Sequence, residues 1–426
     1  MIDISPARFA ALRDDVYATC FSPQGEVVGR VGVEVEFLVL DELTHVPLPL
    51  FGSRGLIERL RRYATRAKWT EFRGYDGTPR FDAGGVAMIS FEPGGQLEIS
   101  TSPCGSASEL LRGLRGIVNP LRAALSDDGV VLLAAGIDPY NDARRVPLQL
   151  RVDRYERMTR YFDEIGPYGV RMMRQTAAIQ VSLDRGPRPA ARWRLLNDLA
   201  PYLVATFANS PHYDGAETGH RSFRALCWRM LDPTRTGMAV PSDDPAAAYT
   251  RFALGANDMM ATLPREAHRP FSETFTAPSG DDGSRWATHL TTLFPEVRPR
   301  GHFEVRSCDA IDPAHFAAPV VLLAGLAYDE RSATEAGILA AESRALLRTA
   351  GEAGLRDVAI ARTARDLFAL ALAGARRLGP AFIGGEDLDA AAQFYADYTA
   401  RDRSPADDRA LPARSSQPTA RMRSPN

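Results

Sequence analysis

Apolar and polar residues alternate along six short stretches of the chain, and the longer stretches between them repeat apolar positions at helical spacing. The alternation predicts strands at 31–40, 87–92, 96–101, 130–136, 176–184 and 302–308. The helical spacing predicts helices at 5–20, 54–69, 106–126, 151–165, 190–209, 246–262, 317–349, 355–377 and 385–399. Because no linker-like segment separates these elements, we expect one α+β domain over residues 1–400. The polar, Pro/Ser/Arg-rich segment 401–426 predicts a disordered C-terminal tail.

The strand at 31–40 places two carboxylates on one of its faces. Side chains alternate along a strand, so Glu34 and Glu36 point to the same side. A solvent-exposed strand would mix Lys, Thr or Arg with these acids, whereas Leu38 and Leu40 follow them here. The pair of acids on this face therefore indicates a functional site, and an ordinary solvent-exposed strand face is the alternative.

A second acidic group surrounds the turn Pro93–Gly95. Glu92 lies just before the turn, and Gln96 and Glu98 share one face of the strand after it, so the two carboxylates can converge on one point. The glycines of the turn would also let the backbone come close to a ligand. A hairpin tip decorated with acids is the alternative.

Two further strands carry polar residues on one face. Gln180 shares one face of its strand with Thr176, Ala178 and Ser182. Glu304 and Arg306 share a face with His302 and Cys308. A satisfied buried amide and a surface ion pair are the respective alternatives.

The four strands make a stronger prediction together than singly. In one antiparallel sheet with helices packed on the other face, Glu34, Glu36, Glu92, Glu98 and Glu304 gather around Gln180 and Arg306. Carboxylates gathered in one concavity repel each other unless cations compensate them. Hard Mg²⁺ or Mn²⁺ suits carboxylate and amide oxygens, whereas Zn²⁺ would favour His and Cys. The sequence therefore predicts a metal-binding polar face on the sheet.

Composition narrows the function further. With 51 basic and 53 acidic side chains, the chain gives no reason to expect nucleic acid or a membrane as partner. Lys68 is the only lysine and lies outside any P-loop motif, so any phosphate must be held by arginine, backbone N–H groups or metal ions. The first residues lack a secretory signal pattern, so we expect a cytoplasmic protein. The candidates for substrate or phosphate binding are Arg174, Arg235, His289, Arg298, Arg300 and Arg306.

Six segments resemble the glutamate–cysteine ligases of the bacterial and plant type, and most closely the γ-glutamylcysteine synthetases of the ergothioneine pathway. They are GVEVEFLVLD (32–41), ISFEPGGQLEIS (89–100), RYERM (154–158), RMMRQTAAIQVSLD (171–184), CWRMLDPTRTG (227–237) and HLTTLFPEVRPRGHFEVRSCD (289–309). The ordered set is specific, although a single G-x-E-x-E is not.

The resemblance implies a glutamine-synthetase-like catalytic domain and assigns roles to individual residues. Glu34 and Glu304 would hold one Mg²⁺ or Mn²⁺, and Glu36, Glu92 and Glu98 a second. Gln180 stands where relatives in the superfamily carry a histidine ligand. Arg306 would stabilise the transferring phosphoryl group and Arg235 would bind a substrate carboxylate. Gln96, Arg174, His289, Arg298 and Arg300 are the further residues expected to bind substrate or nucleotide.

The resemblance implies ATP-dependent ligation of the γ-carboxylate of L-glutamate to the amine of L-cysteine through a γ-glutamyl phosphate. Three alternatives stay open: the same chemistry with another amine, a non-catalytic sensor of glutamate or nucleotide, and a metal-dependent hydrolase. The hydrolase is disfavoured because the His/Asp-rich spacing of such sites is missing. The sequence leaves the oligomeric state open.

Overall fold

The computed structural model describes residues 4–74, 76–237, 242–275 and 282–410. In this part of the chain, nine strands form one sheet in the order β10-β11-β7-β1-β5-β4-β3-β2, and β6 pairs with the end of β1. All of these pairings are antiparallel. The strands are β1 (Val31–Asp41), β2 (Thr70–Arg73), β3 (Pro79–Asp82), β4 (Ala87–Phe91), β5 (Leu97–Thr101), β6 (Val130–Leu133), β7 (Ala178–Leu183), β10 (Val297–Pro299) and β11 (Phe303–Asp309), with β8 (His212–Tyr213) and β9 (Ala216–Glu217) forming a separate ribbon.

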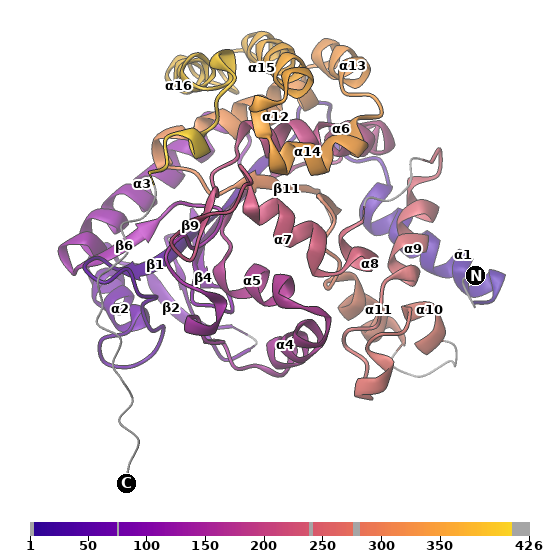
Figure 1. Ribbon diagram of the computed structural model, residues 1–426. Helices are drawn as coiled ribbons and strands as arrows, with labels where there is room; N and C mark the ends of the chain where they lie inside the picture. The colour runs from indigo at the N-terminus through magenta and orange to yellow at the C-terminus, as the bar shows by residue number, and fades with distance from the viewer. Residues whose placement is uncertain (1–3, 75, 238–241, 276–281, 411–426) are drawn as a thin grey trace.

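Helices surround the sheet on both faces (Figure 1). The α-helices are α1 (Pro6–Val16), α2 (Leu56–Ala67), α3 (Ala107–Asp127), α4 (Asp153–Ile165), α5 (Pro167–Gln175), α6 (Pro189–Thr206), α7 (Phe223–Leu231), α8 (Pro233–Thr236), α9 (Pro245–Gly255), α10 (Phe271–Thr274), α11 (Asp282–Leu290), α12 (Ala317–Tyr328), α13 (Glu330–Leu339), α14 (Leu347–Glu352), α15 (Val358–Leu378) and α16 (Gly385–Asp397). None of the described helices is long and apolar enough to cross a membrane.

The central strand β1 separates the core from the polar face. Its residues Val33, Val35 and Phe37 are buried in a core shared with α3, α6 and α12. On the opposite side, Glu34 pairs in register with Gln180 of β7, and Glu36 pairs with Glu98 of β5. The predicted α+β class with an antiparallel sheet is confirmed, since alternation along each strand produced this division.

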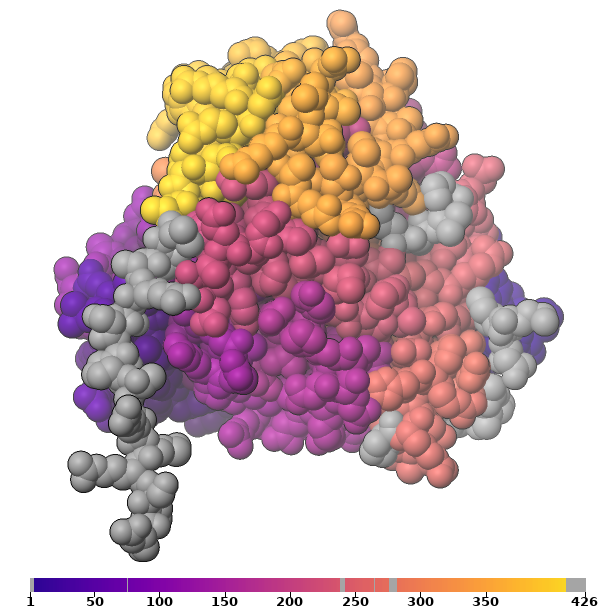
Figure 2. Space-filling view, viewed as in Figure 1, coloured from indigo at the N-terminus to yellow at the C-terminus, as the bar shows by residue number. Residues whose placement is uncertain are grey.

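The polar face is also covered, which the sequence analysis did not expect. Helices α4, α5 and α7 lie in front of the sheet in Figure 1. In the space-filling view of the same side, atoms coloured magenta to rose hide the strands at the centre (Figure 2). Helices α5 and α7 were not predicted, and they close the polar face into a cavity.

Two predicted helices are shorter than expected. The stretch 317–349 is divided into α12, α13 and α14, because Asp329 leaves the helical conformation and caps α13 by accepting a hydrogen bond from the Ser332 amide at 2.8 Å. The stretch 246–262 ends as a helix at Gly255. The short strands β2, β3 and β10 were missed, because few residues carry their alternation.

Strand β11 contains a bulge between Val305 and Cys308. Cys308 consequently pairs with Ile179 and lies in the apolar core, whereas plain alternation placed it beside Glu304. Asp309 then faces the same side as Ala178, away from that core.

The first residues of the predicted tail are packed on the domain. Ala406 donates its amide to Ala208 at 2.8 Å, and the half-buried Arg409 donates to Asn209 Oδ1 at 2.6 Å. Residues 401–410 thus have defined contacts, unlike the expected disorder, and 411–426 lie outside the described residues. The division into a catalytic domain and a tail stays a prediction.

Candidate active site

A cavity of about 180 Å³ lies between the polar face of the sheet and the helices in front of it. Acidic and amide side chains of the sheet form its floor: Glu34, Glu36, Glu92, Gln96, Glu98 and Gln180. Arg298 and Arg306, on strands β10 and β11 of the sheet, form part of its wall. The covering helices and loops contribute the rest of the wall: Arg154, Tyr155, Met158, Met172, Met173, Arg224, Trp228, Thr291 and Phe294. The structure thus brings four of the five predicted acids, all except Glu304, together with Arg298 and Arg306 around one cavity.

The floor acids are held by local hydrogen bonds. Glu36 accepts one from the amide of Ala178 and another from Nε2 of Gln180, both at 2.9 Å. Glu98 accepts one from Oγ of Ser90 at 2.7 Å. These contacts orient the carboxylates but bring no positive charge to them.

The environment of the floor disfavours ionised carboxylates. Burial, and then repulsion by Glu98 and Glu304, raises the pKa of Glu34 from its ordinary 4.5 to about 8. Burial and repulsion by Glu98 raise the pKa of Glu36 to about 7, and the same two causes raise the pKa of Glu92 well above 4.5. A bound cation would remove this cost.

Glu304 differs from the other acids because arginines surround it. It accepts hydrogen bonds from Arg298 Nε and Arg306 Nη1 at 2.7 Å, and Arg300 Nη1 lies 3.6 Å away. Although burial raises the pKa of Glu304, these cations lower it below its ordinary range. Glu304 is fully buried behind the arginines and is not part of the cavity lining.

The set of oxygens fits a hard divalent cation only in part. Gln180 Oε1 is buried without a hydrogen-bond partner and lies on the floor with the acids, as expected for a ligand. As the side chains stand, however, no three carboxylate, imidazole or thiol groups within the described ranges are arranged to hold one ion. For Glu34 and Glu304 to share an ion as predicted, a carboxylate oxygen of Glu304 would have to exchange a hydrogen bond from Arg298 or Arg306 for the ion.

Among the wall residues that the sequence analysis did not name, Arg224 and Trp228 lie beside the predicted Arg306. Arg224 and Arg306 both lie 5.0 Å from the ring of Trp228, a distance that permits cation–π attraction. The Nε atoms of Arg224 and Arg306 are buried without hydrogen-bond partners, so both guanidinium groups retain a donor. The i, i+4 spacing of Arg224 and Trp228 would have indicated a shared face had α7 been predicted.

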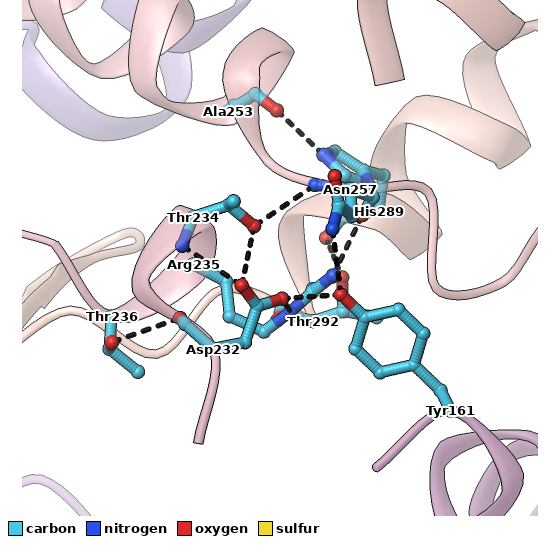
Figure 3. Close-up of polar contacts among 9 residues, drawn as sticks. All are labelled: Tyr161, Asp232, Thr234, Arg235, Thr236, Ala253, Asn257, His289 and Thr292. Carbon is cyan, nitrogen blue, oxygen red and sulfur yellow. Dashed lines mark hydrogen bonds and ion pairs between the residues drawn. The ribbon is translucent and has the colours of Figure 1, made fainter. Parts of the chain in front are cut away.

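Arg235 and His289 do not reach the cavity. Every guanidinium nitrogen of Arg235 donates to the protein: Nε to Asp232, Nη1 to Thr292 and Nη2 to Asn257 (Figure 3). Its side chain is 0% exposed, so the predicted binding of a substrate carboxylate by Arg235 has no geometric support. His289 Nε2 lies 2.7 Å from the Ala253 carbonyl, and burial lowers the pKa of His289 to about 3.

The remaining candidates near the turn at 93–95 have structural partners. Gln96 lines the cavity, but its side chain also accepts from the amide of Gly94 and donates to the Thr176 carbonyl at 3.0 Å. A Cβ at Gly94 would lie 2.1 Å from the Arg174 carbonyl oxygen, so the glycine admits α5 and not a ligand. The Arg174 side chain is turned to Thr159 and lines no described part of this cavity.

A second cavity of about 600 Å³ adjoins the first. Arg298 and Thr291 line both cavities. Arg300, Trp286 and Phe275 contribute to the wall of the second, which combines positive charge with aromatic surface.

Comparison with known proteins identifies the family. The model of glutamate–cysteine ligase family 2 (GCS2) matches residues 30–380, which include all the acids and arginines of the cavity. The chain belongs to glutamate–cysteine ligase family 2. The resemblance inferred from the six segments is therefore confirmed, and the family is one of ligase enzymes.

Individual relatives agree with this family membership. The glutamate–cysteine ligase EgtA of Mycolicibacterium smegmatis is 33% identical over 330 residues, covering 74% of this chain and 73% of the relative. The chloroplastic glutamate–cysteine ligase of Arabidopsis thaliana is 28% identical over 377 residues, covering 82% and 71%. A crystal structure of the Francisella tularensis glutamate–cysteine ligase in complex with AMP superposes with a TM-score of 0.54 at 14% identity, over 90% of this chain and 84% of that one. This last similarity shows a shared fold.

Proposed function

We propose that this family member joins the γ-carboxylate of L-glutamate to the amine of L-cysteine at the expense of ATP, giving γ-glutamylcysteine, ADP and phosphate. The observation that carries the proposal is the cavity that faces Glu34, Glu36, Glu92 and Glu98 on its floor with arginines on its wall. Phosphoryl transfer needs both the acids and the arginines. The arginines and bound metal ions would bind the anionic substrate, and the acids would hold the metal ions. We place this reaction in the cytoplasm.

The floor acids and Gln180 are the residues that would hold Mg²⁺ or Mn²⁺. When bound, these ions neutralise phosphate charge and polarise the phosphoryl oxygens. Burial and repulsion by Glu98 raise the pKa of both Glu34 and Glu36, and both residues provide hard oxygen ligands.

The wall arginines would bind the anionic groups of the substrates. Arg306 and Arg298 are fixed by Glu304 on the side away from the cavity, so their guanidinium groups are oriented before substrate binds. The unpartnered Nε of Arg306 is available to a transferring phosphoryl oxygen, and that of Arg224 to a substrate carboxylate.

Apolar side chains would protect the intermediate. Met158, Met172, Met173 and Phe294 line the cavity opposite the acids. Their apolar surface would disfavour water, which would otherwise hydrolyse a γ-glutamyl phosphate before the amine attacks. The same polarizable thioethers suit the thiol side chain of an incoming cysteine.

The second cavity is the proposed site of the nucleotide base and ribose. Because Arg298 lines both cavities, a nucleotide seated against Trp286 and Phe275 would direct its phosphates toward the acidic floor. Arg300, half exposed at the rim, would contact the phosphates from outside.

The test is an ADP-release assay with ATP, glutamate and a panel of amines, with and without Mg²⁺. We expect release to require glutamate, Mg²⁺ and cysteine, and mass spectrometry to find γ-glutamylcysteine. Equal turnover with alanine or 2-aminobutyrate would contradict the assignment of cysteine as acceptor. ATP binding without turnover of any amine would contradict the ligase itself and favour a sensor.

A further inference from the structure

Arg235 is the largest fully buried side chain in the described part of the protein, and it lies behind the cavity wall. Its partner Asp232 precedes α8 and accepts hydrogen bonds from Arg235 Nε at 2.7 Å and from the Tyr161 hydroxyl at 2.6 Å (Figure 3). Burial raises the pKa of Asp232, but its pairing with Arg235 and its hydrogen bonds bring that pKa below the ordinary value. Asp232 is therefore a fixed, ionised anchor for Arg235.

On the side away from Asp232, Arg235 binds the segment 291–294, which lies between α11 and β10. Its Nη1 donates to the carbonyl of Thr292 at 2.9 Å and to Thr292 Oγ1 at 3.1 Å. Its own carbonyl accepts the amide of Phe294 at 2.8 Å. One buried residue thus fixes two backbone positions on either side of Leu293.

This segment supports the basic wall of the cavity. Phe294 lines the cavity and accepts, at its carbonyl, the indole Nε1–H of Trp228 at 2.8 Å. The Trp228 ring in turn lies 5.0 Å from the guanidinium groups of both Arg224 and Arg306. A continuous series of contacts therefore connects Arg235, through Phe294 and Trp228, to Arg224 and Arg306.

We infer that Arg235 is a positioning residue, which sets the place of Trp228, and through it of Arg224 and Arg306, by holding the segment 291–294. The inference rests on the proposed function for its effect on turnover. A lysine cannot replace Arg235, because its single nitrogen cannot reach Asp232, Thr292 and Asn257 together. A displacement of about 1 Å at an active site can cost about 100-fold in rate.

The test compares Arg235→Lys with wild type by steady-state kinetics and by NMR of ¹⁵N-labelled tryptophan indoles. The Trp228 signal is identified by its loss in Trp228→Phe. We expect kcat of Arg235→Lys to fall about 10–100-fold while KM for glutamate and cysteine stays within about threefold. The Trp228 indole signal shifts, and those of Trp69 and Trp193 stay in place.

Arg115→Lys is the matched control, because Arg115 pairs with Asp387 at 2.7 Å between α3 and α16, outside both cavities. It should leave kcat and the Trp228 signal unchanged. If Arg235→Lys does not fold, Thr292→Val removes one acceptor of Arg235 and should shift the same signal with a smaller loss of kcat.

An unshifted Trp228 signal in the folded variant overturns the inference, whatever happens to turnover. A raised KM for one substrate with that signal unshifted would instead make Arg235 a direct ligand. Wild-type protein without ligase turnover would refute the proposed function alone, since the indole signals are read without substrate.

Discussion

Two buried arginine–carboxylate groups of this protein use the same chemistry to different ends. Every guanidinium nitrogen of Arg235 donates to a protein acceptor, and the side chain is buried away from solvent and from both cavities. Arg306 is fixed by Glu304 on one side only, and its buried Nε lacks a partner beside the cavity. A complete set of hydrogen bonds marks a structural arginine, whereas a buried donor that remains without a partner and lies at a cavity leaves the arginine available for a ligand. Burial alone would not distinguish them.

The largest effect on activity is expected from the acids that lack an arginine. Glu36→Gln keeps the size of the side chain but removes a charge that burial and Glu98 already disfavour. We expect kcat to fall about 100–1,000-fold, in the range seen when one stabilising group of an active site is lost. ADP release at saturating substrate measures this. In the same variant the free energy of unfolding at pH 8 should be equal to or higher than that of wild type. A less stable variant would show that Glu36 is not strained by its surroundings.

The largest effects on stability are expected from the two paired carboxylates. Glu304→Gln and Asp232→Asn each leave buried arginines without a counter-charge, and each should lower the free energy of unfolding by about 3–5 kcal/mol in urea titrations. The exposed pair Arg331–Glu335 provides the control, since Glu335→Gln should cost less than about 1 kcal/mol. If Glu304→Gln is as stable as this control, its arginines are solvated and the comparison drawn above fails.

The pH dependence of stability should separate the floor acids from Glu304. With EDTA present, the raised pKa values of Glu34 and Glu36 mean that the folded protein binds their protons more tightly than the unfolded chain does. Stability from these groups is therefore complete below about pH 4.5 and is lost as pH rises through about 7 and 8. The lowered pKa of Glu304 acts oppositely, since its contribution is present above 4.5 and lost in acid.

Urea unfolding between pH 5 and 9 measures this loss, and Mg²⁺ should reduce it because the ion favours the ionised acids. The double variant Glu34→Gln/Glu36→Gln should show a flatter pH profile than wild type in EDTA. A wild-type profile that is already flat would remove the argument for a cation on the floor.

The smallest effect is expected from Arg300, the outermost cation near Glu304. Its side chain is 51% exposed and its Nη1 lies 3.6 Å from the Glu304 carboxylate, so solvent screens it. Arg300→Ala should raise KM for ATP by no more than about fivefold and leave kcat within about twofold. A change confined to glutamate or cysteine would contradict the placement of the nucleotide in the second cavity.

The parts of the site that follow from neighbours along one strand could be predicted. Alternation alone placed Glu34 and Glu36 side by side, and strand pairing brought Gln180 and Glu98 opposite them. The family resemblance supplied the function and the set of acids. The placement of Glu34 and Glu36 on one face could be predicted because period-2 geometry depends on nothing outside the strand, whereas the roles of the acids stay a prediction.

The partners of the arginines could not be predicted from the sequence. Arg235 and Arg306 are the same residue type in the sequence. Only the tertiary structure gives Arg235 the carbonyls of Thr292 and Asn257 as acceptors. Arg224 was missed with α7, a nine-residue helix whose role depends on the cavity it covers. The ion pair of Glu304 with Arg306 was one alternative, but the contact of Glu304 with Arg298 was not foreseen, since it depends on β10 pairing beside β11.

The bulge in β11 makes the length of this strand as important as its composition. Because one extra residue separates Val305 from Cys308, Arg306 shares the acid side of the sheet while Asp309 reaches the buried hydroxyls of Ser210 and Ser222. Deleting Ser307 would remove the extra residue but leave Cys308 opposite Ile179 and Asp309 opposite Ala178, so the following side chains would keep their sides. The deletion would cost only the hydrogen bond that Ser307 Oγ donates to Glu296 at 2.7 Å, whereas one inserted residue before Cys308, without a further bulge, would turn Asp309 into the apolar core and is the more damaging change.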